Sequence, residues 1–194
     1  LEDLSLTYNI YSEVEADPSE QIVLNAVDYA KEQKVDIVLG FGGGSSMDVA
    51  KIIAILSHPA QQQQLSDLYG MNNAQAPRLS LILVPTTAGT GSEVTPISIV
   101  TTGETTKTGI VAPVLFADVA ILDATFTENL PRHISAATGI DAMVHAIEAY
   151  TSKIKKNPYA DMLAKHALKL LNQNLSLVLE DGRNLEARQN MLVG

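Results

Sequence analysis

The spacing of apolar and polar residues divides the chain into a part that mixes helix and strand patterns and a part that shows helix patterns alone. In the first part, apolar residues recur at helical spacing over residues 18–33 and 46–56, which predicts two helices. Short apolar runs bounded by turn residues predict strands between and after them. The predicted strands cover residues 36–40, 79–84, 97–102 and 119–122.

From residue 127 onward the pattern predicts helices only, over residues 134–150, 158–172 and from 185 to the end. Strands that alternate with helices are typical of an α/β fold whose parallel sheet is covered by helices on both faces. Residues 57–78 contain a glutamine run and a terminal proline, and we expect a polar surface excursion there. The segment TGETTKTG, residues 102–109, is expected to form a turn.

Composition narrows the classes of function. Hydrophobic residues make up 46% of the 194 residues and charged residues 18%, which is typical of a globular chain. A net charge of −9 without a block of Lys or Arg argues against a nucleic-acid partner. No apolar run approaches the ~20 residues of a membrane helix, and Leu1 opens no signal pattern. We therefore expect no membrane partner, and the absence of cysteine suits a reducing cytoplasm.

The stretch VDIVLGFGGGSSMDVAK runs from an apolar strand through glycines into a helix. Such a turn lets backbone approach a ligand, and the free amides and positive dipole end of the helix favour a phosphate. The glycine spacing is G-x-G-x-x-S, so the usual dinucleotide fingerprint is not met. The alternative is a tight, well-capped turn, because Ser45 and Asp48 are spaced as in a capping box.

A second loop, LILVPTTAGTGSEVT, also follows an apolar strand. Thr86, Thr87, Thr90 and Ser92 supply hydroxyl groups, and glycines supply room. Loops at the carboxyl ends of neighbouring parallel strands meet in one crevice, where ligands bind, so two such loops indicate a nucleotide site. Alternatively, the hydroxyl groups serve only as turn and cap residues.

Asp141 and His145 lie four residues apart in a predicted helix, so their side chains share one face. A carboxylate oxygen and an imidazole nitrogen suit Fe(II) or Zn(II), although two ligands are too few for a catalytic site. An ordinary intrahelical contact explains the same spacing. His58, His133 and His166 are expected to be solvated or to act as caps.

The ordered motifs GGGSSMDVAK, VPTTAGTGSEVT, LDATFTENLP and ATGIDAMVHAIEAY resemble those of the iron-containing (group III, metal-dependent) alcohol dehydrogenases. The resemblance extends from about Asp17 to the end of the chain. It implies a Rossmann-like nucleotide domain over residues 1–126 and the start of a helical metal-binding domain over residues 127–194, with cofactor and metal in the cleft between them.

The resemblance also implies the residues of the site. The glycine turn would hold the pyrophosphate of NAD or NADP, the threonine loop would line the cofactor, and a lysine before a strand, six residues ahead of Pro113, would contact it. The implied metal ligands for Fe²⁺ or Zn²⁺ are Asp141 and His145. The implied cofactor-binding residues are Gly42, Gly43, Gly44, Ser45, Asp48, Thr86, Thr87, Thr90 and Lys107.

Members of the family have a further strand and helix ahead of the region matching Leu1, and two more metal-binding histidines after the region matching Gly194. We therefore interpret the chain as an internal fragment, which by itself is expected to fold partly, to self-associate and to be inactive. Which alcohol is used, and whether NAD or NADP serves, stay open.

The intact protein is expected to be a cytoplasmic homo-oligomer. It would transfer a hydride between a nicotinamide cofactor and a small alcohol or aldehyde, at a metal that stabilises the alkoxide. The alternatives are a same-fold relative such as a glycerol dehydrogenase or dehydroquinate synthase, and a non-catalytic nucleotide-binding or interaction fragment.

Overall fold

The computed structural model describes residues 6–194. The predicted domain 1–126 includes five residues at its start, 1–5, that lie outside the described residues. The expectation about a signal pattern at Leu1 concerns the same five residues. Backbone contacts divide the chain into two compact units. The first comprises the described residues up to Gly40 with Ser45–Leu83 and Val94–Val119; the second comprises Phe41–Gly44, Val84–Glu93 and Ala120–Gly194. The predicted domain boundary after residue 126 stays a prediction.

Two helices of the first part form where the apolar spacing predicted them. Helix α1 (Glu20–Glu32) is capped by Ser19, whose hydroxyl accepts from the amide of Ile22 at 3.4 Å, and it buries its regularly spaced valines and alanines. Helix α2 (Gly44–Leu56) is hydrophobic on most of its surface and is largely buried. Such a helix belongs to the interior of an α/β layer, with side chains packed on both sides.

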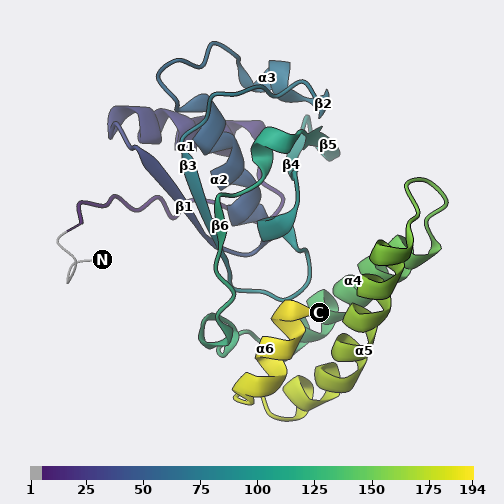
Figure 1. Ribbon diagram of the computed structural model, residues 1–194. Coiled ribbons are helices and arrows are strands. Elements are labelled where there is room, and N and C mark those ends of the chain that lie inside the picture. The colour runs from purple at the N-terminus through teal and green to yellow at the C-terminus, as the bar shows by residue number, and fades with distance from the viewer. Residues whose placement is uncertain (1–5) are drawn as a thin grey trace. The chain divides into compact units, whose positions relative to one another are not determined.

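A three-stranded sheet has the order β1-β3-β6. Strands β1 (Ile37–Gly42) and β3 (Ser80–Pro85) lie side by side in Figure 1. The amide of Thr86 donates to the carbonyl of Gly42 at 2.9 Å, so both strands finish at the same edge of the sheet and run parallel. The predicted parallel sheet is confirmed, although β6 (Val119–Ala120) is shorter than the predicted strand.

Only one face of β1 is buried within this chain. Val38 and Gly40 are buried against α2 and β3, whereas Ile37 and Leu39 on the other face are about half exposed. The expectation that helices cover both faces is therefore wrong for β1 within the described residues. The reason is that the strand's side chains alternate, and α2 packs on one of the two sets.

A second sheet has the order β2-β5-β4 and was not predicted in this form. Strand β4 (Ile97–Thr102) pairs antiparallel with β5 (Thr106–Val111), which in turn pairs parallel with β2 (Gly70–Met71). The expected turn over residues 102–109 is wrong in its second half, because Thr106 and the residues after it return as a strand. Only Gly103–Thr105 reverse the chain.

The expected polar excursion over residues 57–78 is also partly wrong. It contains a short helix, α3 (Leu65–Leu68), besides β2. Leu65 and Leu68 are buried in the larger core of the first unit, together with Val23, Ile52 and Ile110. Their spacing of three residues brings both side chains to the same face, and this face attaches the glutamine-rich segment to the core.

The later part of the chain is helical, as predicted. Helices α4 (Arg132–Thr151) and α5 (Pro158–Glu180) pack along each other, and α6 (Leu185–Val193) packs on α5. Helix α5 continues beyond its predicted end at residue 172, since Leu175 and Val178 extend its buried stripe. None of the helices in residues 6–194 combines the length and the apolar character needed to cross a membrane. Three short 3₁₀ turns are Ser92–Val94, Pro113–Leu115 and Ala124–Thr127.

Candidate functional site

The glycine turn joins β1 directly to α2. Gly42 ends β1 and Gly44 is the first residue of α2, so a helix N-terminus with unpaired amides follows the strand at once. A Cβ on Gly44 would lie 2.9 Å from Cγ2 of Thr90, whereas a Cβ on Gly43 would come no closer than 3.6 Å to the side chain of Thr87. Gly44 is thus required by the protein's own packing, and Gly43 is not.

The expected capping box is wrong. Helix α2 already begins at Gly44, so Ser45 lies inside its first turn and not at the cap. The hydroxyl of Ser45 instead accepts from the backbone amide of Asp17 at 3.3 Å. Because a hydroxyl group also carries one proton, Ser45 keeps a donor that can bind an anion at the helix N-terminus.

The side chain of Asp48 contacts β4 and a neighbouring residue of α2. Its carboxylate accepts from the amide of Ile99 at 2.9 Å and lies 3.6 Å from Nζ of Lys51. Lys51 is completely buried, and its ammonium donates to the carbonyl of Ile97 at 2.6 Å. The backbone carbonyl of Asp48 accepts from the buried hydroxyl of Ser98 at 3.0 Å. These contacts fix one side of α2 to β4.

Lys107 lies within β5 and not before a strand, which corrects one detail of the expectation. Its Nζ lies 2.6 Å from a carboxylate oxygen of Asp17. Asp17 is the residue whose amide binds Ser45, so one residue joins Ser45 and Lys107 although they are far apart in sequence. The backbone of Asp17 has φ of +53°, a left-handed conformation that Asp adopts more readily than most residues.

The threonine loop meets both the glycine turn and helix α4 inside the second unit. Thr87 and Thr90 face Gly43 and Gly44, as the contacts above show. A Cβ on Gly89 would lie 2.7 Å from Cβ of Thr138, so the loop packs directly on α4. Thr90 also has a local role, because its hydroxyl accepts from the amide of Ser92 at 3.2 Å. The turn function that was left open for these hydroxyls therefore holds for Thr90.

Asp141 and His145 lie one and two turns after Thr138 on α4. Nε2 of His145 is 3.8 Å from Oδ1 of Asp141, and both side chains are about half exposed. Metal–nitrogen and metal–oxygen bonds of about 2.0–2.2 Å add up to more than this separation, so one ion can contact both atoms. In residues 6–194 no group of three or more His, Cys, Asp and Glu side chains could hold a metal ion. Within the described residues the pair therefore offers two ligand atoms at a separation that one ion can span.

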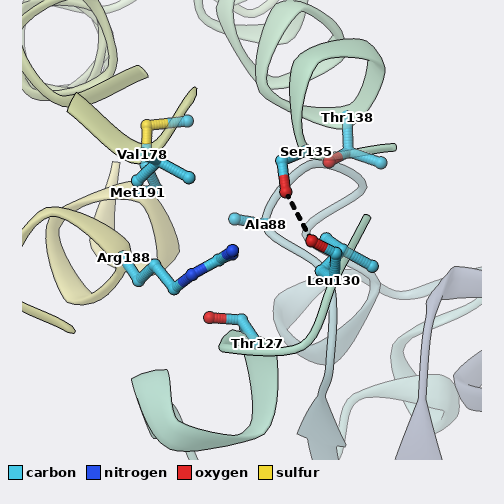
Figure 2. A pocket seen from close by; sticks show the side chains of 8 residues that line it. All are labelled: Ala88, Thr127, Leu130, Ser135, Thr138, Val178, Arg188 and Met191. Carbon is cyan, nitrogen blue, oxygen red and sulfur yellow. Dashed lines mark hydrogen bonds between the residues drawn. The ribbon is translucent and has the colours of Figure 1, made fainter. Parts of the chain in front are cut away.

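A small cavity lies in the second unit, beside the point where the threonine loop packs on α4 (Figure 2). Its volume of about 10 Å³ is room for a single water molecule. Arg188, only 4% exposed, points toward it and donates to the backbone carbonyls of Gly182 and Glu128. Burial lowers the pKa of the Arg188 guanidinium below its usual range, and nearby Glu128 raises it. The cavity is too small for a cofactor or substrate.

The other three histidines are in a turn or exposed to solvent, as expected. His58 accepts from the amide of Ala60 at 3.1 Å, which is a turn contact, and His133 and His166 are exposed. Sequence reasoning missed Asp17 and Lys51. The three-residue spacing of Asp48 and Lys51 could have indicated their contact, but nothing in the sequence around Asp17 identifies its partners.

Models of two families match the chain. One, described as iron-containing alcohol dehydrogenase, matches residues 1–124. The other, described as the C-terminal part of the Fe-containing alcohol dehydrogenase family, matches residues 135–194.

Similar curated proteins include a long-chain-alcohol dehydrogenase of Geobacillus thermodenitrificans, which is 40% identical over 96% of this chain and 47% of its own length. The NAD-dependent methanol dehydrogenase of Bacillus methanolicus is 33% identical over 98% of this chain and 50% of its own. The chain thus spans about half the length of these relatives.

Among solved structures, an iron-containing alcohol dehydrogenase from Thermotoga maritima superposes with a TM-score of 0.88, at 39% identity. The match covers 99% of this chain and 52% of the Thermotoga chain. A sulfoacetaldehyde reductase from Bifidobacterium kashiwanohense in complex with NAD+ gives a TM-score of 0.87 at 33% identity, over 95% of this chain and 49% of its own.

Proposed function

The chain belongs to the iron-containing alcohol dehydrogenase family, and we propose that the protein transfers a hydride between a nicotinamide cofactor and a small alcohol or aldehyde at a divalent metal. The observation that carries this proposal is the series of contacts within the second unit. The glycine turn meets the threonine loop, and the loop packs on the helix of Asp141 and His145. These contacts support the proposal, because they join the proposed phosphate-binding turn to the proposed pair of metal ligands by one short path.

The proposed cofactor residues divide by their chemistry. The backbone amides at the start of α2 and the proton of Ser45 would donate to the pyrophosphate, with the positive end of the helix dipole adding to the attraction. Thr86 and Thr87 would offer hydroxyl groups to the cofactor. The ammonium of Lys107 would contact the cofactor near Ser45, since Asp17 contacts both residues, although the Asp17 carboxylate offsets part of its charge. For Asp48, the contacts with Ile99 and Lys51 support a role in placing α2.

Asp141 and His145 are proposed as ligands of Fe²⁺ or Zn²⁺. When bound, such an ion stabilises the alkoxide form of the substrate, from which a hydride leaves for the nicotinamide. Asp141 supplies negative charge and His145 a neutral nitrogen donor, and α4 fixes their separation. We also propose that the protein is a cytoplasmic homo-oligomer and that its domain boundary follows residue 126. The boundary is supported by the two family matches, which end at residue 124 and begin at residue 135.

Gly43→Ala tests the cofactor site without disturbing the fold. The new methyl group would come no closer than 3.6 Å to Thr87, which is ordinary van der Waals contact. It would, however, occupy space that a pyrophosphate on the turn requires. In the protein expressed from its complete coding sequence, the Kd for NAD should rise at least about tenfold while the Tm stays unchanged, because lost phosphate hydrogen bonds are charge-assisted.

Gly109→Ala is the matched control, because its Cβ would lie 3.6 Å from Cδ1 of Ile99, away from the turn. It should leave the Kd for NAD unchanged. Equal Kd values for Gly43→Ala and the unaltered protein would remove the glycine turn from the cofactor site, and with it the proposed function in this form.

A further inference from the structure

Three hydrogen bonds between distant parts of the first unit, joined by the backbones of β4 and α2, form a closed ring around the start of α2. Ser45 in the first turn of α2 accepts from the amide of Asp17. The backbone carbonyl of Asp17 accepts from the hydroxyl of Thr101 in β4 at 3.0 Å. Two residues earlier in β4, the amide of Ile99 donates to Asp48, which returns the path to α2.

Further contacts reinforce this ring at Thr101 and at Asp48. The amide of Thr101 donates to the carbonyl of Pro18 at 2.8 Å, and Thr101 forms an isolated parallel bridge with Ser19. On the other side, buried Lys51 donates to Ile97 while lying 3.6 Å from the carboxylate of Asp48. The segment before α1, strand β4 and helix α2 are thus fixed to one another.

We propose that Asp48, Asp17 and Thr101 are positioning residues of the phosphate-binding turn, and that none of the three owes its effect on the cofactor to direct contact. This inference rests on the proposed function, because it assigns a role in binding the same pyrophosphate. The physical argument is that a helix N-terminus binds an anion well only where its amides are held in a fixed direction.

The ring also limits the directions open to the Ser45 proton. Since the oxygen of Ser45 accepts from Asp17, the hydroxyl proton cannot point at that amide and is turned to the remaining directions. The carboxylate of Asp17 meanwhile contacts Lys107, so Asp17 links Lys107 to Ser45 in the first turn of α2. Loss of the Thr101 contact would release Asp17, and both the Ser45 proton and the Lys107 ammonium would lose their orientation.

Neighbouring threonines of β4 give a matched test. Thr101→Val removes the hydroxyl that holds Asp17. Thr102→Val removes a hydroxyl that instead contacts Thr106 and Thr108 within the β4–β5 hairpin and lies outside the ring. Both residues are half-buried, and both substitutions keep the β-branched shape that suits a strand.

The measurement is competition of ADP and of adenosine against NAD, in the protein expressed from its complete coding sequence. Thr101→Val should weaken ADP about fivefold, as for one lost neutral hydrogen bond, and change adenosine by less than about twofold. Asp48→Ala should weaken ADP by about tenfold, because its contact is charge-assisted. Asp48→Asn, which keeps an acceptor for Ile99 but not the negative charge that faces Lys51, should recover only part of that loss. Thr102→Val should match the unaltered protein for both ligands.

Equal ADP affinities for Thr101→Val and Thr102→Val would overturn the inference, as would equal losses for ADP and adenosine, which would indicate a general loss of structure. Gly43→Ala separates this result from failure of the proposed function. If Gly43→Ala weakens ADP and Thr101→Val does not, the turn binds phosphate without help from the ring. If neither substitution weakens ADP, the turn is not the phosphate site.

Discussion

Gly40→Ala should destabilise the first unit, because a single methyl group has no room where β1 crosses α2. The new Cβ would lie 2.6 Å from Cδ2 of Leu83 and 2.7 Å from Cβ of Ala50. Carbon atoms at ordinary contact are about 3.5–4.0 Å apart, so each of the two contacts is roughly 1 Å too short. Neither neighbour can turn away easily, since Leu83 is fully buried and Ala50 has no rotamer to change.

The cost follows from that crowding. Inserting a methyl group into a packed core typically costs 1–3 kcal/mol, and two simultaneous clashes place Gly40→Ala near about 3 kcal/mol. For a chain of this size, each kcal/mol lowers Tm by about 2–4 °C, so a fall of roughly 6–12 °C is expected. Thermal unfolding followed by circular dichroism measures it.

The control for Gly40→Ala is Gly109→Ala, whose methyl group would have ordinary clearance in β5. Gly109→Ala should change Tm by no more than about 2 °C, in line with a surface-type substitution. A Tm for Gly40→Ala within that range would contradict the prediction, since it would show that α2 and β1 are not packed as closely as the structure has them.

Two further predictions concern other charged groups. Hydrogen bonds from Arg78 and the amide of Leu81 lower the pKa of Asp118 to about 2, so its contribution to stability is complete above about pH 4 and is lost as the pH falls toward 2. Asp118 is half exposed, so after solvent screening the loss of stability is about 1 kcal/mol. In urea unfolding, the difference in free energy of unfolding between the unaltered protein and Asp118→Asn should shrink from pH 5 to pH 3. A difference that stays constant over this range would contradict the prediction. Arg188→Met should lower the free energy of unfolding by about 2–4 kcal/mol, because it removes a buried guanidinium and leaves the part-buried carbonyls of Gly182 and Glu128 without that donor. Unchanged urea midpoints for Arg188→Met would show that water replaces the guanidinium at no cost.

Local patterns predicted most of the elements of the fold. The apolar run into β1 and the helical spacing of α1, α2 and α4 specify type and approximate length, because those signals come from neighbours in the sequence. The end of α5 was readable too: Leu171, Leu175 and Val178 continue the stripe beyond the polar residues at which the predicted helix stopped. The three-residue spacing of Leu65 and Leu68 likewise indicates a buried helical turn, but the neighbouring glutamine run favoured a polar surface segment.

The partners of the site residues could not be predicted in the same way. The spacing of Asp48 from Ser45 resembled a capping box, but the carboxylate of Asp48 accepts from the amide of Ile99, which is 51 residues away. Asp17 binds Ser45 and Lys107, which are 28 and 90 residues away. Such contacts depend on how the strands are ordered in the sheets, and no local periodicity contains that order. The sequence identified residue types suited to phosphate and metal, and the structure shows which groups hold them in place.

The most direct test of the proposed function is alcohol-dependent reduction of NAD by the protein expressed from its complete coding sequence and loaded with iron, before and after His145→Ala. We expect that the unaltered protein reduces NAD and that His145→Ala abolishes this activity, because a methyl group cannot replace a nitrogen ligand. His166→Ala, which changes an exposed histidine on α5, should keep full activity. Undiminished NAD reduction by His145→Ala would contradict the account, since the pair on α4 would then have no part in the reaction.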